Sequence, residues 1–211
     1  MDYKSNNIKD KFKIIISVGD ESGIGPEIIL KALFSKEIPH NLDFIIVGSK
    51  NNLENTYKNL KSLGVKNIVD PNNYQIHDIR IPFEINKPKK SNGNASFFYL
   101  KKAIEIVQKY TNAALVTGPI CKKSWSLAGH NYSGQTELLA ESCQVKDVGM
   151  LFTAKSPITG WRFNTLLATT HIPLCDVPKQ LSTNLIHTKL DLFAKFCKTY
   201  VNKPLLKVAG L

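Results

Sequence analysis

Runs of apolar residues alternate with segments of helical periodicity along most of the chain. The runs at 13–18 and 43–48 are rich in isoleucine and valine and predict two buried strands, with a helix-length segment between them. A third run at 113–117 predicts another strand, and residues 204–209 predict a last one. This alternation is typical of a mostly parallel sheet with helices on its faces, so we expect a three-layer α/β/α fold.

Two later segments place apolar residues at intervals of three and four, which predicts helices with one apolar face. The members of these two sets are Phe97, Leu100, Ile104 and Val107, and then Ile186, Leu190, Phe193, Cys197 and Tyr200. Residues 72–88 have the weakest periodicity. For them the pattern predicts an irregular, partly strand-like connection.

Glycine, lysine and histidine gather in four stretches, the last of which follows a further apolar run at 165–168 that predicts a strand. The stretches are GDESGIGPE (19–27), TGPICK (117–122), AGHNYSGQTE (128–137) and TTHIPL (169–174). The first lacks the third glycine of a dinucleotide fingerprint and is also typical of a tight strand-to-helix turn. Residue types alone leave Lys122 open as a solvated lysine or a contact for an anion. His171 likewise either satisfies its own loop or binds a metal.

In order and spacing, these four stretches resemble the 4-hydroxythreonine-4-phosphate dehydrogenase family of vitamin B6 biosynthesis, whose forms run close to GDPAGIGPE, TGPINK, AGxxxxGHTE and TTHIPL. The resemblance runs from about Ile14 to the last residue and matches the N-terminal two-thirds of the family, so we expect the C-terminal third to be absent. It implies a truncated fold similar to isopropylmalate dehydrogenase. The expected parts are a polar tail at 1–12, a first α/β lobe at 13–127 and an incomplete second lobe at 128–211.

The resemblance also implies an activity, which is NAD-dependent oxidation and decarboxylation of 4-phosphooxy-L-threonine to 3-amino-2-oxopropyl phosphate. A divalent metal (Zn²⁺, Mg²⁺ or Co²⁺) and a cytoplasmic homodimer belong to this expectation. His171 matches the first metal-binding histidine of the family, whose other two lie beyond Leu211, one of them supplied by the partner subunit. Gln135 and Thr136 match the substrate-binding His-Thr pair, and Lys122 matches the family's lysine and is the candidate catalytic residue. Most NAD contacts of the family lie beyond Leu211.

The chain departs from the family pattern at two places. Glu21 and Ser22 replace Pro-Ala, and Gln135 replaces histidine. Glutamine forms hydrogen bonds as a neutral imidazole does, but it carries no positive charge opposite a phosphate. Two alternatives therefore stay open: a related dehydrogenase of a phosphorylated four-carbon hydroxy acid, such as threonate or erythronate phosphate, and a catalytically inactive remnant.

Composition narrows the class of protein. Hydrophobic residues make up 43% and charged residues 21%, as in globular proteins. Apolar stretches stay well below the ~20 residues of a membrane span, and the polar N-terminus lacks a secretory signal, so we expect a cytoplasmic protein without a membrane partner. The net charge is +11, but the lysines are spread along the chain and the densest cluster, 87–90, is short and lacks aromatic residues. We therefore expect no nucleic-acid partner. The small phosphorylated substrate is what the family resemblance implies.

Overall fold

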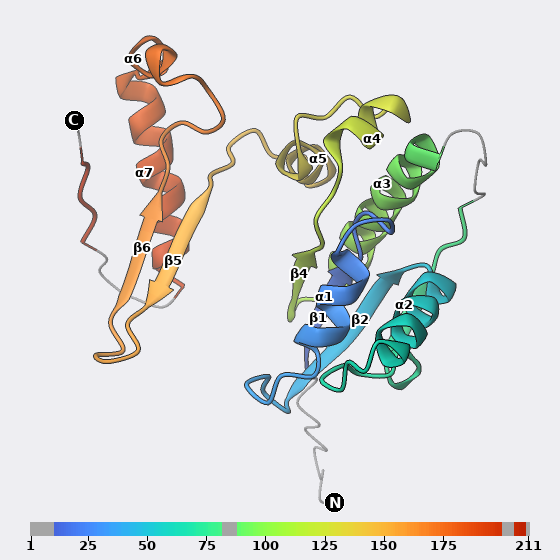
Figure 1. Ribbon diagram of the computed structural model, residues 1–211. Coiled ribbons are helices and arrows are strands. Elements are labelled where there is room, and N and C mark those ends of the chain that lie inside the picture. The colour runs from blue at the N-terminus through green and yellow to red at the C-terminus, as the bar shows by residue number, and fades with distance from the viewer. Residues whose placement is uncertain (1–10, 82–87, 200–204, 210–211) are drawn as a thin grey trace, which may run out of the picture. The chain divides into compact units, whose positions relative to one another are not determined.

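The computed structural model describes residues 11–81, 88–199 and 205–209 of the chain (Figure 1). The chain divides into two compact units, and the division falls between Ser142 and Cys143. Each unit has its own sheet. The predicted tail at 1–12 lies largely outside the described residues, and the predicted lobe boundary after residue 127 remains a prediction.

The first unit is built on a four-stranded parallel sheet with the strand order β3-β2-β1-β4. Its strands are β1 (Phe12–Ser17), β2 (Leu42–Gly48), β3 (Gln75–Asp78) and β4 (Ala113–Thr117). The C-terminal halves of β1 and β2 are buried, because isoleucine and valine at successive positions suit a sheet that is covered on both faces. The strands predicted at 13–18, 43–48 and 113–117 are confirmed. The short 3-10 helix η1 (Pro71–Asn73) and β3 occupy the first part of the stretch predicted to be irregular and partly strand-like, and residues 82–87 of that stretch lie outside the described residues.

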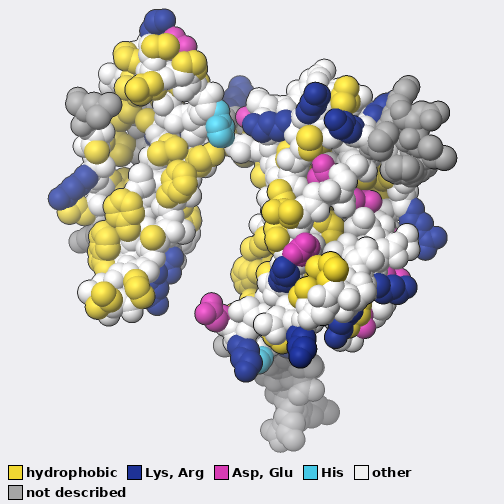
Figure 2. All heavy atoms as spheres, viewed as in Figure 1, with side chains coloured by type: hydrophobic (Ala, Val, Ile, Leu, Met, Phe, Trp, Pro, Cys, Tyr) yellow, Lys and Arg dark blue, Asp and Glu magenta, His cyan; other side chains and the backbone are white. Residues whose placement is uncertain are grey.

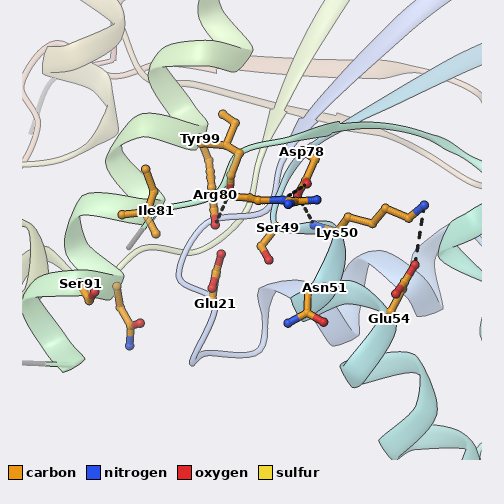
Figure 3. Close-up of a pocket in the computed structure, with 13 residues that line it drawn as sticks. Glu21, Ser49, Lys50, Asn51, Glu54, Asp78, Arg80, Ile81, Ser91 and Tyr99 are labelled. Carbon is orange, nitrogen blue, oxygen red and sulfur yellow. Dashed lines mark hydrogen bonds and ion pairs between the residues drawn. The ribbon is translucent and has the colours of Figure 1, made fainter. Parts of the chain in front are cut away.

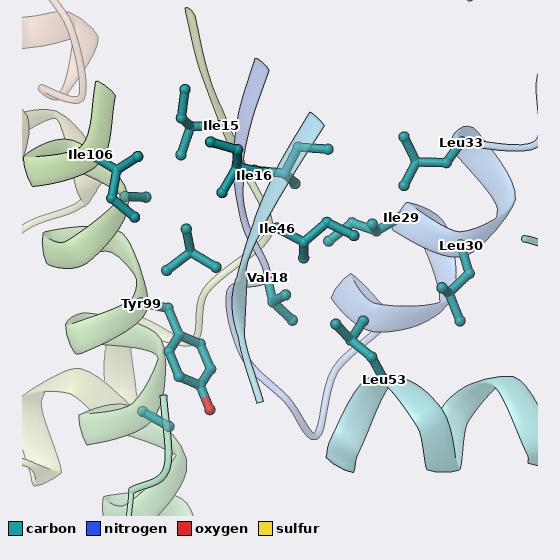
Figure 4. Packing of buried hydrophobic residues seen from close by; sticks show 14 of the residues in the cluster. Ile15, Ile16, Val18, Ile29, Leu30, Leu33, Ile46, Leu53, Tyr99 and Ile106 are labelled. Carbon is teal, nitrogen blue, oxygen red and sulfur yellow. The ribbon is translucent and has the colours of Figure 1, made fainter. Parts of the chain in front are cut away.

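Helices cover both faces of this sheet. α1 (Gly25–Ala32) and α2 (Lys50–Ser62) lie on one side, and the long α3 (Pro88–Val107) lies on the other (Figure 4). The hydroxyl of Ser49 caps α2 by accepting a hydrogen bond from the Asn52 N–H at 3.1 Å. Apolar side chains of all three helices and of the two central strands form one buried cluster. The predicted three-layer α/β/α arrangement is therefore confirmed for this unit.

After β4 the chain forms two further helices, α4 (Lys122–Leu127) and α5 (Gln135–Ser142). Both contribute to a second buried cluster around Trp125, whose indole is fully buried and whose N–H donates to the Ser96 hydroxyl at 2.8 Å. The other buried members are Phe97, Leu100, Ile104 and Leu138. This cluster holds α4 and α5 against α3 and so fixes the residues at their N-terminal ends.

The second unit contains an antiparallel hairpin and a helix. The hairpin consists of β5 (Leu151–Lys155) and β6 (Arg162–Leu166). The short η2 (Leu174–Asp176) and α6 (Val177–Gln180) lead into α7 (Thr183–Cys197), which Ser182 caps with a hydrogen bond from the Leu185 N–H. The helix predicted from the spacing after Ile186 is confirmed up to Cys197, and Tyr200 lies outside the described residues.

The last predicted strand is wrong within the described residues. Residues 205–209 form no strand, and Pro204 lies outside the described part of the chain. Leu205 is 83% exposed and Val208 is 63% exposed. An extended segment becomes a strand only when a neighbouring backbone satisfies its N–H and C=O groups, and no described strand pairs with this one.

Figure 2 shows the charged side chains on one face of the molecule. The Lys and Arg side chains of the first unit are scattered over its visible surface and do not gather into one stripe. Across residues 11–81, 88–199 and 205–209, none of the helices combines the length and the hydrophobicity that crossing a lipid bilayer requires.

Candidate active site

The loops that follow β1 and β4 are joined to each other. The Asp20 N–H donates to the Pro119 carbonyl at 2.9 Å, and the Gly118 N–H donates to the Ser17 carbonyl at 2.7 Å. A β-carbon at Gly118 would lie only 2.2 Å from the Val18 carbonyl oxygen, so this close approach requires glycine. The two glycine-containing motifs at 19–27 and 117–122 therefore form one continuous surface at the carboxyl end of the sheet.

This surface lies where the direction of the chain changes between neighbouring strands. From β1 the chain continues into α1, which packs with α2, whereas from β4 it continues into α4, which packs with α3 on the opposite face. Ligands of open α/β sheets bind at such a switch point, outside the carboxyl ends of the strands. The geometry thus makes the β1 and β4 loops the candidate active site.

The N-terminal end of α5 is held against the β4 loop by Gln135. Its Nε2 donates to the Gly118 carbonyl at 3.0 Å, whereas its Oε1 is buried and has no hydrogen-bond partner among the described residues. Thr136 follows in the first turn of α5, and its side chain is exposed. Gln135 and Thr136 therefore lie next to the β4 loop, one facing inward and the other facing solvent.

Lys122 reaches the same place from α4. Its side chain is exposed, and a β-carbon placed on Gly134 would lie 3.7 Å from its Nζ and 3.4 Å from Oε2 of Glu137. An ammonium group, a threonine hydroxyl and the free N–H groups of a helix start are the groups that bind a phosphate. The structure thus brings together three of the four sequence-predicted site residues, although the Glu137 carboxylate opposes an anion there.

His171 belongs to the second unit and follows β6. β6 ends at Leu166 and pairs antiparallel with β5, so the histidine lies five positions beyond the end of a hairpin strand. Its backbone has a φ of +56°, which is uncommon for a residue other than glycine, and its side chain is exposed. No group of three or more His, Cys, Asp or Glu residues within the described ranges could hold a metal ion. Within the described ranges, the His171 imidazole therefore has no neighbouring group of ligands with which to hold a metal ion.

Comparison of motifs does not indicate a role for Glu21, but the structure does. It lines a cavity of about 620 Å³ at the carboxyl ends of β2 and β3, and Figure 3 shows it between Ser91 of α3 and the start of α2, where Ser49 and Asn51 lie. Burial, with the nearby carboxylates of Asp20 and Asp78, raises the pKa of Glu21 to about 7. The sequence signal is the replacement of Pro-Ala by Glu-Ser, but only the folded chain shows that the carboxyl is enclosed.

Asp78 is the opposite case in the same cavity. It accepts hydrogen bonds from the Lys50 N–H and from Nε of Arg80, both at 2.9 Å. The Lys50 N–H and, to a smaller extent, Arg80 hold the pKa of Asp78 below its usual value. The cavity thus stabilises the charged form of Asp78 and disfavours the charged form of Glu21.

Comparison with known proteins identifies the family. The model of the pyridoxal phosphate biosynthetic protein PdxA matches residues 40–211. The chain belongs to the PdxA family. It is 44% identical over 190 residues to a 4-hydroxythreonine-4-phosphate dehydrogenase of Nostoc sp., and 43% identical over 201 residues to one of a Synechococcus species. These alignments cover 87% and 94% of the chain, but only 52% and 60% of the two relatives.

The fold agrees with a solved PdxA-family structure. A crystal structure of a 4-hydroxythreonine-4-phosphate dehydrogenase from Burkholderia phymatum superimposes with a TM-score of 0.70 at 23% identity, and it covers 92% of this chain and 60% of that one. This likeness concerns the fold alone. The chain thus spans about half to three-fifths of the length of the PdxA-family proteins that it matches.

Proposed function

We propose that the chain contributes the substrate-binding part of a 4-hydroxythreonine-4-phosphate dehydrogenase, an enzyme of pyridoxal phosphate biosynthesis. Family membership supports the class of reaction, an oxidation by a dehydrogenase. The observation that carries the proposal for this chain is the meeting of Lys122, Gln135 and Thr136 beside the joined β1 and β4 loops.

Each of these residues has a distinct task in the proposal. Lys122 and the Thr136 hydroxyl contact the phosphate of 4-phosphooxy-L-threonine, because both side chains are exposed and the Lys122 ammonium lies beside Gly134, just before α5. Gln135 holds α5 to the Gly118 carbonyl and leaves its inward oxygen as an acceptor for a substrate hydroxyl or amine.

A nicotinamide cofactor, NAD, and a divalent metal belong to the proposal through the family resemblance. NAD would accept the hydride, and the metal would polarise the substrate oxygen. His171 is the proposed metal ligand in this chain, but one imidazole does not make a site, and the described residues provide no cluster around it. The described residues of this chain therefore do not by themselves support metal-dependent chemistry. A cytoplasmic homodimer, with a partner subunit completing the metal site, is likewise proposed.

The departure at Gln135 leaves a second candidate reaction open. The side chain is a neutral amide, so the position lacks the positive charge that the family's histidine can place opposite a phosphate. The alternative substrate is a related phosphorylated four-carbon hydroxy acid, such as erythronate phosphate.

Assaying the product of the intact gene on both substrates tests the proposal. We expect NADH formation with 4-phosphooxy-L-threonine, and a KM that rises about ten- to a hundredfold in Lys122→Met, since a charged hydrogen bond is lost. Lys123→Met removes the neighbouring exposed lysine and should leave KM unchanged. A preference for erythronate phosphate would select the second candidate, and equal effects of the two variants would remove Lys122 from the site.

A further inference from the structure

The cavity beside Glu21 does not include Lys122, Gln135 or Thr136 in its lining. What it binds is therefore a separate question from the proposed function. Its position outside β2 and β3, at the carboxyl ends of parallel strands, is one where α/β proteins bind ligands. Its volume of about 620 Å³ lies within the range of small-molecule sites.

Most charged groups of the cavity are already paired with one another. Nζ of Lys50 lies 3.7 Å from the Glu54 carboxylate, and Nε of Arg80 lies 2.9 Å from the Asp78 carboxylate. Asp78 also accepts the N–H of Lys50 at the N-terminal end of α2, so a carboxylate already occupies the position that would attract an anion. The cavity is therefore poorly suited to a phosphate or a carboxylate.

Glu21 is left as the charge without a counterpart. Its Oε1 exposes less than 1 Å² and has no hydrogen-bond partner within the described part of the chain. This oxygen is an acceptor when Glu21 is ionised, and a buried acceptor without a donor is costly. The missing group is a donor, and beside a carboxylate a cationic donor interacts most strongly.

We propose that this cavity binds a small polar ligand through a primary ammonium group placed against Glu21. A divalent cation fits less well, because the described residues offer no group of three or more His, Cys, Asp or Glu side chains to hold it. An ammonium group needs only a few acceptors, and its three N–H groups match the carboxylate and amide oxygens. Ser49, Ser91 and Asn92 line the cavity with hydroxyl and amide groups that suit a polar ligand body.

Binding of such a ligand depends on the ionisation of Glu21. The groups around it are Asp20 on its own loop, Lys50 and Glu54 on α2, Asp78 at the end of β3 and Arg80 just after it, and the Tyr99 phenol on α3. With the pKa of Glu21 near 7, about a tenth of the sites are ionised at pH 6 and about nine-tenths at pH 8. The affinity for an ammonium ligand should therefore rise about tenfold between these pH values.

Titrating the 211-residue chain with ethanolamine, followed by the backbone amide signals of Glu21, Asn51 and Asn92 in NMR spectra, tests the proposal. Ethylene glycol is the matched probe, because it replaces the ammonium group with a hydroxyl. We expect saturable shifts with ethanolamine, about tenfold tighter binding at pH 8 than at pH 6, and at least tenfold weaker binding of ethylene glycol. Equal binding of the two probes, or no saturable shift with ethanolamine, would overturn the proposal.

Two variants give the residue-level control. Glu21→Gln keeps the shape of the side chain but removes its charge, so it should weaken ethanolamine binding at pH 8 at least tenfold and abolish the pH dependence. Glu37→Gln neutralises an exposed carboxylate that does not line the cavity and should bind as the unaltered chain does. Unchanged binding by Glu21→Gln would contradict the assignment even where the probes behave as expected. The ethanolamine comparison with ethylene glycol needs no variant, so misfolding of one variant leaves the test intact.

Discussion

Gln135 is the residue at which this chain departs most clearly from its family at the candidate site. Its amide joins α5 to the β4 loop by donating a hydrogen bond to the Gly118 carbonyl, and this bond requires no charge on the side chain. In Gln135→His we expect the KM for the phosphorylated substrate to fall about tenfold, because an imidazolium donates a charge-assisted hydrogen bond to phosphate. The KM for NAD should stay the same. Steady-state kinetics on the intact gene's product measure both constants, and an unchanged or higher substrate KM would show that a histidine at position 135 does not reach the phosphate.

Glu21 makes stability depend on pH. Its pKa is about 7 in the folded chain and 4.5 in an unfolded reference, so the folded state binds the proton more tightly and loses stability as pH rises from 4.5 through 7. Glu21→Gln removes this loss. Relative to the unaltered chain, the variant should gain roughly 1–2 kcal/mol of unfolding free energy between pH 5 and pH 8, after allowance for solvent screening.

Urea unfolding at the two pH values gives this difference. Other titrating groups are common to both proteins, so their contributions cancel in the comparison. The same pH dependence in both proteins would show that the Glu21 carboxyl is not held in a poorly solvated site.

The site residues were predictable to different degrees. Lys122, Gln135 and Thr136 follow from motifs, but their proximity depends on how α4 and α5 pack on α3, which local spacing does not encode. The enclosure of Glu21 was not predictable from its neighbours, because the residues that surround it come from α2, β3 and α3. His171 was found by its motif alone, and a lone exposed imidazole carries no physical sign of a metal.

Among the elements, the strands with apolar sequences were predictable, including the edge strand β4, whereas the edge strand β3 was predicted only as part of an irregular connection. The C-terminal halves of β1 and β2 are buried and therefore contain runs of isoleucine and valine. β3 lies at the edge of the sheet and is mostly exposed, so its sequence QIHD carries little hydrophobic signal. The apolar segment at 205–209 shows the converse, since hydrophobicity without a pairing strand does not produce a strand.

The packing of α4 on α3 yields a prediction at the scale of elements. Ser96 is buried and accepts the indole N–H of Trp125, so Ser96→Ala leaves a buried donor unsatisfied. We expect a loss of about 1–3 kcal/mol in unfolding free energy, measured by urea denaturation. Ser62→Ala on the exposed side of α2 is the control and should cost much less. Equal costs would mean that the indole hydrogen bond does not help to hold α4.

For the whole molecule, we expect the 211-residue chain assayed alone to form no NADH from 4-phosphooxy-L-threonine, even with added Zn²⁺ or Mg²⁺. One imidazole binds such ions weakly, and the described chain offers His171 no further cluster. We also expect concentration-dependent self-association in size-exclusion chromatography. The hairpin of the second unit exposes Phe152, Trp161 and Phe163 by 56%, 64% and 51%, and hydrophobic side chains gather on its visible face (Figure 2). Turnover by a soluble monomer would show that the active site is built differently.

The central claim is that Lys122 and Thr136, at the joined β1 and β4 loops, form a phosphate site for 4-phosphooxy-L-threonine. Calorimetric titration of the 211-residue chain with this compound, and with 4-hydroxy-L-threonine lacking the phosphate, tests it directly. We predict saturable binding of the phosphorylated compound only, weakened at least tenfold by Lys122→Met and unaffected by Lys123→Met. Equal binding of both compounds, or equal affinity of the two lysine variants, would contradict the account.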